Sequence, residues 1–244
     1  MRIVHDVLKT CGYCAKEAFS FTYLWNDAEY CRQVFPFVSE QYPNDVYLLV
    51  SIRPTELLHT LDNSFMSALA ISFRKQLFHR SAMDRNTTLF LNCLCNAGGQ
   101  INHNLRVQLE DDPYYFKKYV FGYAAEDEEA AARYIEENRR DDETLLATIR
   151  GCLLNTELFA LYKGKDPAQK AYGYFVELAT KVTVLPIRPN SGGTIETVET
   201  IWKAERQKTE EIELEALEYV LELDTDKTDD FLSRWKERTS ISSN

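Results

Sequence analysis

The stretch "DVYLLVSI", residues 45–52, decides the fold of this chain. It is short, almost continuously apolar, and shows no alternation of polar and apolar residues. A run of this kind is typical of a β-strand that is buried on both faces. Such strands belong to sheets that carry helices, so the run predicts an α/β arrangement around it.

The two segments that follow extend this arrangement. The segment "RPTELLHTLDNSFMSALAISFRKQLFH" (53–79) begins with Pro-Thr-Glu, which is a helix-start signature. Its apolar residues recur at helical spacing and are Phe65, Met66, Leu69, Ala70 and Phe73. The segment "TTLFLNCLC" (87–95) reads as the next strand. A helix between two strands predicts that at least part of the sheet is parallel.

Two further elements are predicted upstream. "AFSFTYLW" (18–25) is rich in aromatic residues and indicates a strand. "NDAEYCRQVFPFVSEQY" (26–42) opens with Asn26 and Asp27 in capping positions, which favours a helix. Pro36 is then expected to kink or divide that helix, because proline has no amide donor.

Downstream, "EDDPYYFKKYVFGY" (110–123) interleaves six aromatic residues with two lysines. Asp111 or Asp112 followed by Pro113 predicts a helix start. On such a helix the tyrosines at 115, 119 and 123 share one stripe.

Two interpretations of this stretch remain open. The stripe either packs in the core between two halves of the protein, or forms an aromatic surface for a protein partner. A base-stacking platform is less favoured, because acidic residues surround it. Lys117 and Lys118 point away from the stripe, so we expect both to be exposed and name them as candidate partner-binding residues.

The rest of the chain is helical in character. Residues 125–164 predict helices with a break near Asp141, and 167–189 begin as a helix and end in "KVTVLPI", a possible strand. After the joint "NSGGT" (190–194), residues 195–223 predict a long helix, and a last short helix follows. The fold class expected is α+β or α/β: a small N-terminal sheet with flanking helices, then a mainly helical C-terminal half. The domains expected are 1–110 and 111–244, with a helical segment after 193.

The helices after residue 193 carry apolar stripes on charged surfaces. Such a segment has too little apolar surface to fold alone, so we expect residues 195–238 to dock on a partner or to fold back on residues 125–186. The candidate partner-binding residues in this segment are Trp202, Leu217, Leu221, Phe231 and Trp235.

Charge and composition exclude several classes of protein. The net charge is −10, so direct tight binding to DNA is not expected, because phosphate contacts need clustered lysine and arginine. The N-terminus lacks the apolar core of a signal peptide, and no run approaches the ~18 apolar residues of a membrane span. These features predict a cytoplasmic protein with no membrane contact.

The sequence contains no recognisable catalytic constellation. Cys11 and Cys14 form a C-x-x-C pair, but no clear strand precedes it as in thioredoxin-like proteins. The glycine-containing "NAGGQ" (96–100) lacks the G-K-[ST] ending of a phosphate loop. The four histidines show no metal-ligand spacing. We therefore expect that the chain is not an enzyme and uses no cofactor or metal.

Three patches carry a resemblance to a known family. "AMDRNTTLFLNCLC" (82–95), "EDDPYYFKKYVFGY" (110–123) and "AYGYFVELATKVTVLPI" (171–187) occur in an order and spacing that resemble the middle components of bacterial ABC-three-component systems. Lamassu-type defence systems are members of this group.

The resemblance implies a non-catalytic adaptor or regulatory subunit. Its partners would be an SMC/Rad50-like ATPase and an effector, often a nuclease, that act against phage or plasmids. Two alternatives remain: a cryptic thiol- or metal-dependent enzyme built on Cys11 and Cys14, and an unrelated protein-interaction module.

Overall fold

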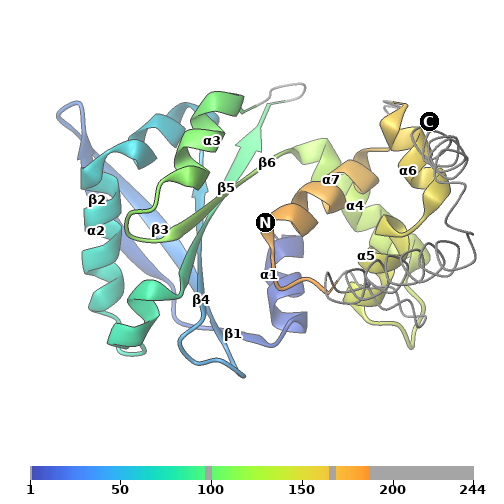
Figure 1. Ribbon diagram of the computed structural model, residues 1–244, viewed down its shortest axis with the longest axis horizontal. Coiled ribbons are helices and arrows are strands. Elements are labelled where there is room, and N and C mark those ends of the chain that lie inside the picture. Colours follow the sequence, from blue (N-terminus) through green and yellow to red (C-terminus); the bar gives the residue numbers. More distant parts are fainter. Residues whose placement is uncertain (1, 97–100, 165–168, 187–244) are drawn as a thin grey trace, which may run out of the picture. The chain divides into compact units, whose positions relative to one another are not determined.

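The structure is a computed structural model that describes residues 2–96, 101–164 and 169–186. These residues belong to one compact unit, residues 1–188. In this unit a mixed sheet lies between two layers of helices, with α2 and α3 on one face and α1, α4 and α7 on the other (Figure 1). The predicted fold class, a sheet with flanking helices followed by a helical region, is confirmed.

The sheet has six strands, and only the three at its β6 end, β4 to β6, are parallel. The strands are β1 (Tyr13–Ala15), β2 (Phe19–Trp25), β3 (Ala28–Ser39), β4 (Val46–Ile52), β5 (Thr87–Cys95) and β6 (Lys117–Ala124). Their order is β1-β3-β4-β5-β6, and β2 also pairs with β3. The pairs β4–β5 and β5–β6 are parallel, whereas β3 is antiparallel to β1, β2 and β4. The strands predicted at 18–25, 45–52 and 87–95 are confirmed.

The helix predicted over residues 26–42 is wrong, because this segment is the long strand β3. Asn26 and Asp27 have φ angles of 48° and 61° and form the two-residue turn of a β2–β3 hairpin. Both residue types favour helix caps as well as left-handed turn positions, so the local signal was ambiguous.

Pro36 is compatible with β3 because of where it lies in the sheet. Its carbonyl accepts a hydrogen bond from the Lys16 amide, at 2.9 Å, in the interval between β1 and β2. The amide that proline lacks would point toward this interval, where no strand residue needs it. The proline therefore interrupts no ladder hydrogen bond.

The segment after β4 forms two helices rather than one. A 3₁₀-helix, η1 (Pro54–Leu61), precedes α2 (Asn63–Arg74), and the Asp62 carboxylate caps α2 by accepting from the Ser64 amide. The helix-start signature at Pro54 is correct, and the five apolar residues named above are all buried on α2. A second short 3₁₀-helix, η2 (Ser81–Arg85), leads into β5.

The helix predicted to begin at Asp111 or Asp112 is also wrong. The helix in this region is α3 (His103–Asp111), which is capped by the Asn102 side chain and ends where that helix was expected to begin. Tyr115, with a φ of 65°, then turns the chain into β6. In β6 alternate residues face opposite layers, so the tyrosines at 115, 119 and 123 form no helical stripe.

The helical region after the sheet agrees with expectation as far as it is described. It contains α4 (Ala125–Asn138), α5 (Leu145–Leu153), α6 (Thr156–Lys163) and α7 (Lys170–Lys181), and α1 (Arg2–Thr10) packs with it. The predicted break near Asp141 separates α4 from α5. Residues 182–186 form no strand, and residues 195–238 lie outside the described part of the chain.

Two hydrophobic clusters, one on each face of the sheet, form the core. The first joins β2–β6 to η1, α2 and α3, and the second joins β1 and β3–β6 to α1, α4, α5 and α7. β4 contributes to both clusters, as its almost continuous apolar run predicted, and β5 beside it does the same. The predicted boundary at residue 110 stays a prediction, although β6, which follows it, is part of the sheet.

No single helix in the described ranges is both long and apolar enough to cross a bilayer; α5 and α6 meet that criterion only as a pair, and they are bent by 57° at their junction.

Candidate interaction surface

The two lysines that the sequence singled out lie at the start of β6 and have opposite environments. Lys117 is exposed, and its ammonium lies 5.0 Å from the centre of the Tyr119 ring. Lys118 is buried, with 1% of its surface exposed. Because neighbouring residues of a strand point to opposite faces, only one of the two reaches solvent. The expectation that both are exposed is therefore wrong for Lys118.

Lys118 holds together the loop that precedes β6. Its Nζ donates to the carbonyl oxygens of Asp112, Tyr114 and Phe116, at 3.1, 2.6 and 3.1 Å. It also lies 2.9 Å from the Asp112 carboxylate. A buried ammonium needs such a set of acceptors, because an unpaired charge is costly to remove from water. Lys118 therefore stabilises the fold, and Lys117 is the residue of the pair that a partner can reach.

Lys117 borders a cavity of about 610 Å³ at the amino ends of the parallel strands. The residues that line it are Gln41, Tyr42, Pro43, Asn44, Asp45, Arg85, Asn86, Thr87, Thr88 and Lys117. They come from the β3–β4 turn and from the starts of β5 and β6. Neither cysteine nor histidine lines this cavity.

Hydrogen bonds order the wall that the β3–β4 turn contributes. The Asp45 amide donates to the Tyr42 carbonyl at 2.8 Å, and the Tyr42 amide donates to Ser39 Oγ at 3.1 Å. Tyr13 donates its hydroxyl to the Asp45 carboxylate at 2.5 Å, and burial together with this bond raises the pKa of Tyr13. The Asp45 carboxylate is engaged by Tyr13, while Arg85 and Lys117 are exposed, so the accessible charges of the rim are mainly positive.

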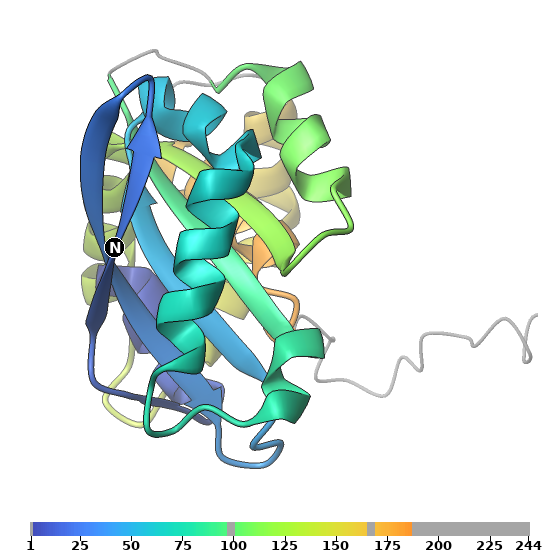
Figure 2. The same cartoon turned by 90° about the vertical axis from the view of Figure 1, so that its left-hand side faces the viewer.

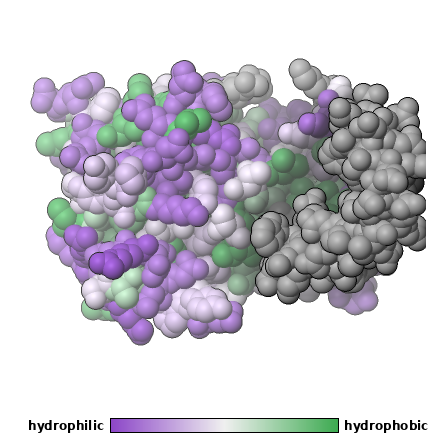
Figure 3. Space-filling view, viewed as in Figure 1, coloured by the Kyte–Doolittle hydropathy of each residue, from purple (hydrophilic) through white to green (hydrophobic). Residues whose placement is uncertain are grey.

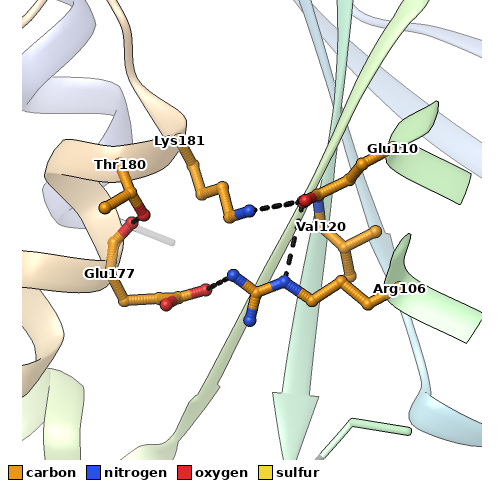
Figure 4. Close-up of polar contacts among 6 residues, drawn as sticks. All are labelled: Arg106, Glu110, Val120, Glu177, Thr180 and Lys181. Atoms are coloured by element: carbon orange, nitrogen blue, oxygen red, sulfur yellow. Dashed lines mark hydrogen bonds and ion pairs between the residues drawn. The ribbon is translucent and has the colours of Figure 1, made fainter. Parts of the chain in front are cut away.

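An ionic cluster at the outer edge of β6 was not found from the sequence. It joins Arg106 and Glu110 of α3 to Glu177 and Lys181 of α7 (Figure 4). Lys181 Nζ lies 2.6 and 2.7 Å from the two Glu110 oxygens, and Arg106 lies 2.7 Å from Glu177. Burial raises the pKa of Glu177, an effect that Arg106 and Lys181 partly offset.

The cluster links the two helical layers around the edge of the sheet. Glu110 also accepts the backbone amide of Val120 in β6, at 2.9 Å. The i, i+4 spacings of 106 with 110 and of 177 with 181 were visible in the sequence as two separate helical pairs. Their contact across 71 residues is a property of the tertiary structure alone.

Five cysteines of the described region have raised pKa values, so their thiols hold their protons more firmly than a free thiol. Burial raises the pKa of Cys11, and a hydrogen bond to Glu40 raises that of Cys14. Burial also raises the pKa of Cys93 to about 12 and that of Cys152 to about 11. A reactive cysteine has the opposite shift, because the thiolate is the nucleophile.

Three histidines in the described ranges contact other side chains of the fold. His59 Nδ1 lies 3.1 Å from the Tyr23 hydroxyl, and burial lowers the pKa of His59. His79 Nε2 lies 2.9 Å from Asp84, and His5 packs against aromatic rings. No three His, Cys, Asp or Glu side chains of the described residues are grouped so that they could hold a metal ion.

The other five candidate partner-binding residues lie outside the described residues. They are Trp202, Leu217, Leu221, Phe231 and Trp235. Their assignment stays a prediction.

The comparisons with known proteins point to one family. Residues 45–149, from the start of β4 into α5, match the family described as ABC-three component (ABC-3C) system Middle Component 1. The chain has no significant match among curated proteins or among solved structures. The matched part contains the three parallel strands, α2, α3 and Lys117, and it amounts to 105 of the 244 residues. This central part of the chain is therefore similar to the middle components of ABC-three-component systems, the group that its sequence motifs resemble.

Proposed function

We propose that this chain is a non-catalytic adaptor subunit that links an SMC/Rad50-like ATPase to an effector in a Lamassu-type, cytoplasmic bacterial defence system. The observation that carries the proposal is the match of residues 45–149 to a middle component of a three-component system. A component of such a system works by contact with other proteins. The effector is a nuclease that acts against phage or plasmid DNA.

The surface around Lys117 supports an adaptor role. Its accessible charges, Arg85 and Lys117, are positive, whereas the whole chain has a net charge of −10. A positive rim on an acidic protein favours an acidic segment of a partner and orients it during encounter. The rim lies within or directly beside the matched residues, as expected if the family uses it.

The thiol environments support the non-catalytic part of the proposal. Cys11 and Cys14 both have raised pKa values, so few of these thiols ionise near neutral pH. This observation weighs against a thiol enzyme built on the C-x-x-C pair.

Co-purification tests the proposal. The tagged chain is co-expressed with the proteins encoded beside its gene, and we expect it to capture an ATPase with a coiled coil. Lys117→Glu should weaken this capture by about tenfold or more in affinity, because charge reversal places like charges opposite each other. Lys117→Arg is the matched control and should retain capture.

Two results would contradict the proposal. Capture of no neighbouring protein by the wild-type chain would exclude the adaptor role. Loss of defence in a Cys11→Ser, Cys14→Ser double variant that folds and still assembles would indicate thiol chemistry instead.

A further inference from the structure

Strand β2 forms an outer edge of the sheet. Among the described residues it pairs with β3 alone (Figure 2). The β2–β3 turn is closed by the Trp25–Ala28 pair, and from there alternate residues of β2 direct their backbone groups away from β3. These residues are Ser20, Thr22 and Leu24. The Leu24 carbonyl accepts from Ser64 Oγ at 2.7 Å, which agrees with this direction.

The backbone groups of Ser20 and Thr22 that point away from β3 have no hydrogen-bond partner among the described residues. Both residues are exposed. Their amide and carbonyl groups form a row that can accept another strand.

β2 carries none of the features that usually prevent edge-to-edge pairing. Its sequence, "FSFTYLW", has no charged residue and no proline. Its register with β3 is continuous over all seven residues, so it contains no bulge. Charges, prolines and bulges are the common protections of exposed edges, and a long neutral edge without them pairs readily.

We propose that β2 pairs with β2 of a second copy of this chain, in an antiparallel arrangement centred on Phe21. In this register Ser20 of each copy lies opposite Thr22 of the other. Each such pair exchanges two backbone hydrogen bonds, so four bonds join the copies and the sheet continues across a twofold axis.

The core of each copy is unchanged by this pairing. Phe21 is 2% exposed and packs edge-on against Phe65 of α2, with ring centres 5.0 Å apart. Its backbone hydrogen bonds are made to β3, so no group of the core has to be released.

The self-complementary register favours a second copy as the occupant of this edge, because Ser20 and Thr22 supply both halves of each hydrogen-bonded pair. Two chains of charge −10 repel each other over most of their surfaces, but β2 contributes no charge to the contact. The register also brings the exposed Lys16 and Glu17 of each copy near Asp27 in the turn of the other, so an attractive and a repulsive contact offset each other there. No residue of β2 lines the cavity beside Lys117, so the proposed contact is separate from that surface.

The experiment measures the molar mass of the full chain by sedimentation equilibrium. Wild-type protein at about 100 μM should be a dimer, and dilution should dissociate it. Thr22→Pro removes one outward-facing amide and no hydrogen bond within the chain, because the Thr22 amide points away from β3. We expect this variant to be monomeric. Thr22→Val keeps the amide and should remain dimeric.

Thr22→Lys provides a second route to the same test if Thr22→Pro does not fold. Two lysines placed beside the twofold axis should raise the dissociation constant by at least about tenfold. A monomeric wild-type chain at this concentration would overturn the proposal, as would a folded Thr22→Pro variant that stays dimeric. A wild-type monomer that loses capture of a neighbouring protein on Thr22→Pro would assign the edge to that protein and equally overturn it.

Discussion

At the β6 edge of the sheet, side chains from neighbouring helices accept the outward-facing amides of Val120 and Ala124, whereas at the β2 edge those of Ser20 and Thr22 have no partner in the described residues. Glu110 accepts the Val120 amide, and Asp127 accepts the Ala124 amide at 3.0 Å. The ionic cluster then connects the helical layers around β6. One edge is closed by the chain itself, and the other is left available.

The two strands also differ in their charged residues. β6 begins with two lysines and is followed by acidic residues, while β2 is uncharged. In the view of Figure 3, the visible surface over α2 and α3 is largely hydrophilic, with isolated hydrophobic residues. The difference teaches that a surface for association need not be apolar, because unpaired backbone groups in a neutral strand are sufficient to accept a partner.

Removing the ammonium of Lys118 should have the largest effect on stability. Lys118→Met leaves buried carbonyl groups without a donor and Asp112 without its ion pair, so we expect a loss of about 3 kcal/mol in the free energy of unfolding. Urea denaturation followed by circular dichroism measures it. Lys117→Met, at the exposed neighbour, should change stability by less than about 0.5 kcal/mol. Similar losses in both variants would show that burial does not distinguish the two lysines.

Opening the β6 edge should have the next largest effect. Glu110→Ala removes the acceptor of the Val120 amide and the partner of Lys181, so we expect a loss of about 2 kcal/mol. Glu110→Gln retains an oxygen for the amide and should lose about half as much. The variants are compared by urea denaturation. Equal losses would mean that the Val120 hydrogen bond contributes nothing to closing this edge.

The buried Glu56 and the half-buried Glu177 should respond to pH in opposite directions. Beside the β2–β3 hairpin, burial raises the pKa of Glu56, but its bonds to Arg32 at 2.5 Å and to the Arg53 amide outweigh burial and leave the pKa below its ordinary value of 4.5. Its contribution to stability is therefore present above pH 4.5 and is lost as the pH falls through the folded pKa. Glu177 has a raised pKa, so its ionisation lowers stability as the pH rises above 4.5.

Glutamine variants measure this contrast, because glutamine mimics the protonated acid. Glu56→Gln should lower the free energy of unfolding at about pH 7 and have little effect at about pH 3. Glu177→Gln should raise the free energy of unfolding at about pH 7 relative to wild type, and should have less effect at about pH 3. Urea denaturation at both pH values gives the two differences, and effects of the same sign would contradict the assigned pKa directions.

The smallest effect is expected in the hairpin turn. Asp27 has a φ of 61°, which glycine adopts with less strain, so Asp27→Gly should stabilise the fold by about 0.5 kcal/mol. Asn26→Ala is the contrasting variant and should destabilise it, because alanine tolerates a positive φ poorly. Thermal unfolding gives both changes, and a destabilising Asp27→Gly would indicate that the Asp27 side chain has a role beyond the turn.

The parts of the fold that were predicted correctly have sequence patterns that extend over many residues and favour one type of element. β4 is an almost continuous apolar run, β5 is rich in apolar residues, and α2 repeats its apolar residues over several turns. The two errors, at 26–42 and 111–123, both came from Asn, Asp or Pro at the start of an aromatic segment. These residues occur at helix starts and in turns alike, so the local pattern alone did not separate a helix from a strand.

The candidate surface likewise has one feature that the sequence could predict and one that it could not. That Lys117 and Lys118 differ in burial follows from strand alternation, which the helical interpretation concealed. The contact between α3 and α7 could not be predicted, because no local pattern pairs residues 71 positions apart.

The sequence by itself determined the α/β class, the buried central strands, the helical region after the sheet and the similarity to a middle component, because each depends on patterns within short stretches of chain. Only the tertiary structure decided which edge of the sheet is closed, which lysine is buried and which carboxylates share the ionic cluster. These properties depend on the order of the strands and on the distance between helices far apart in sequence, and long-range packing determines both.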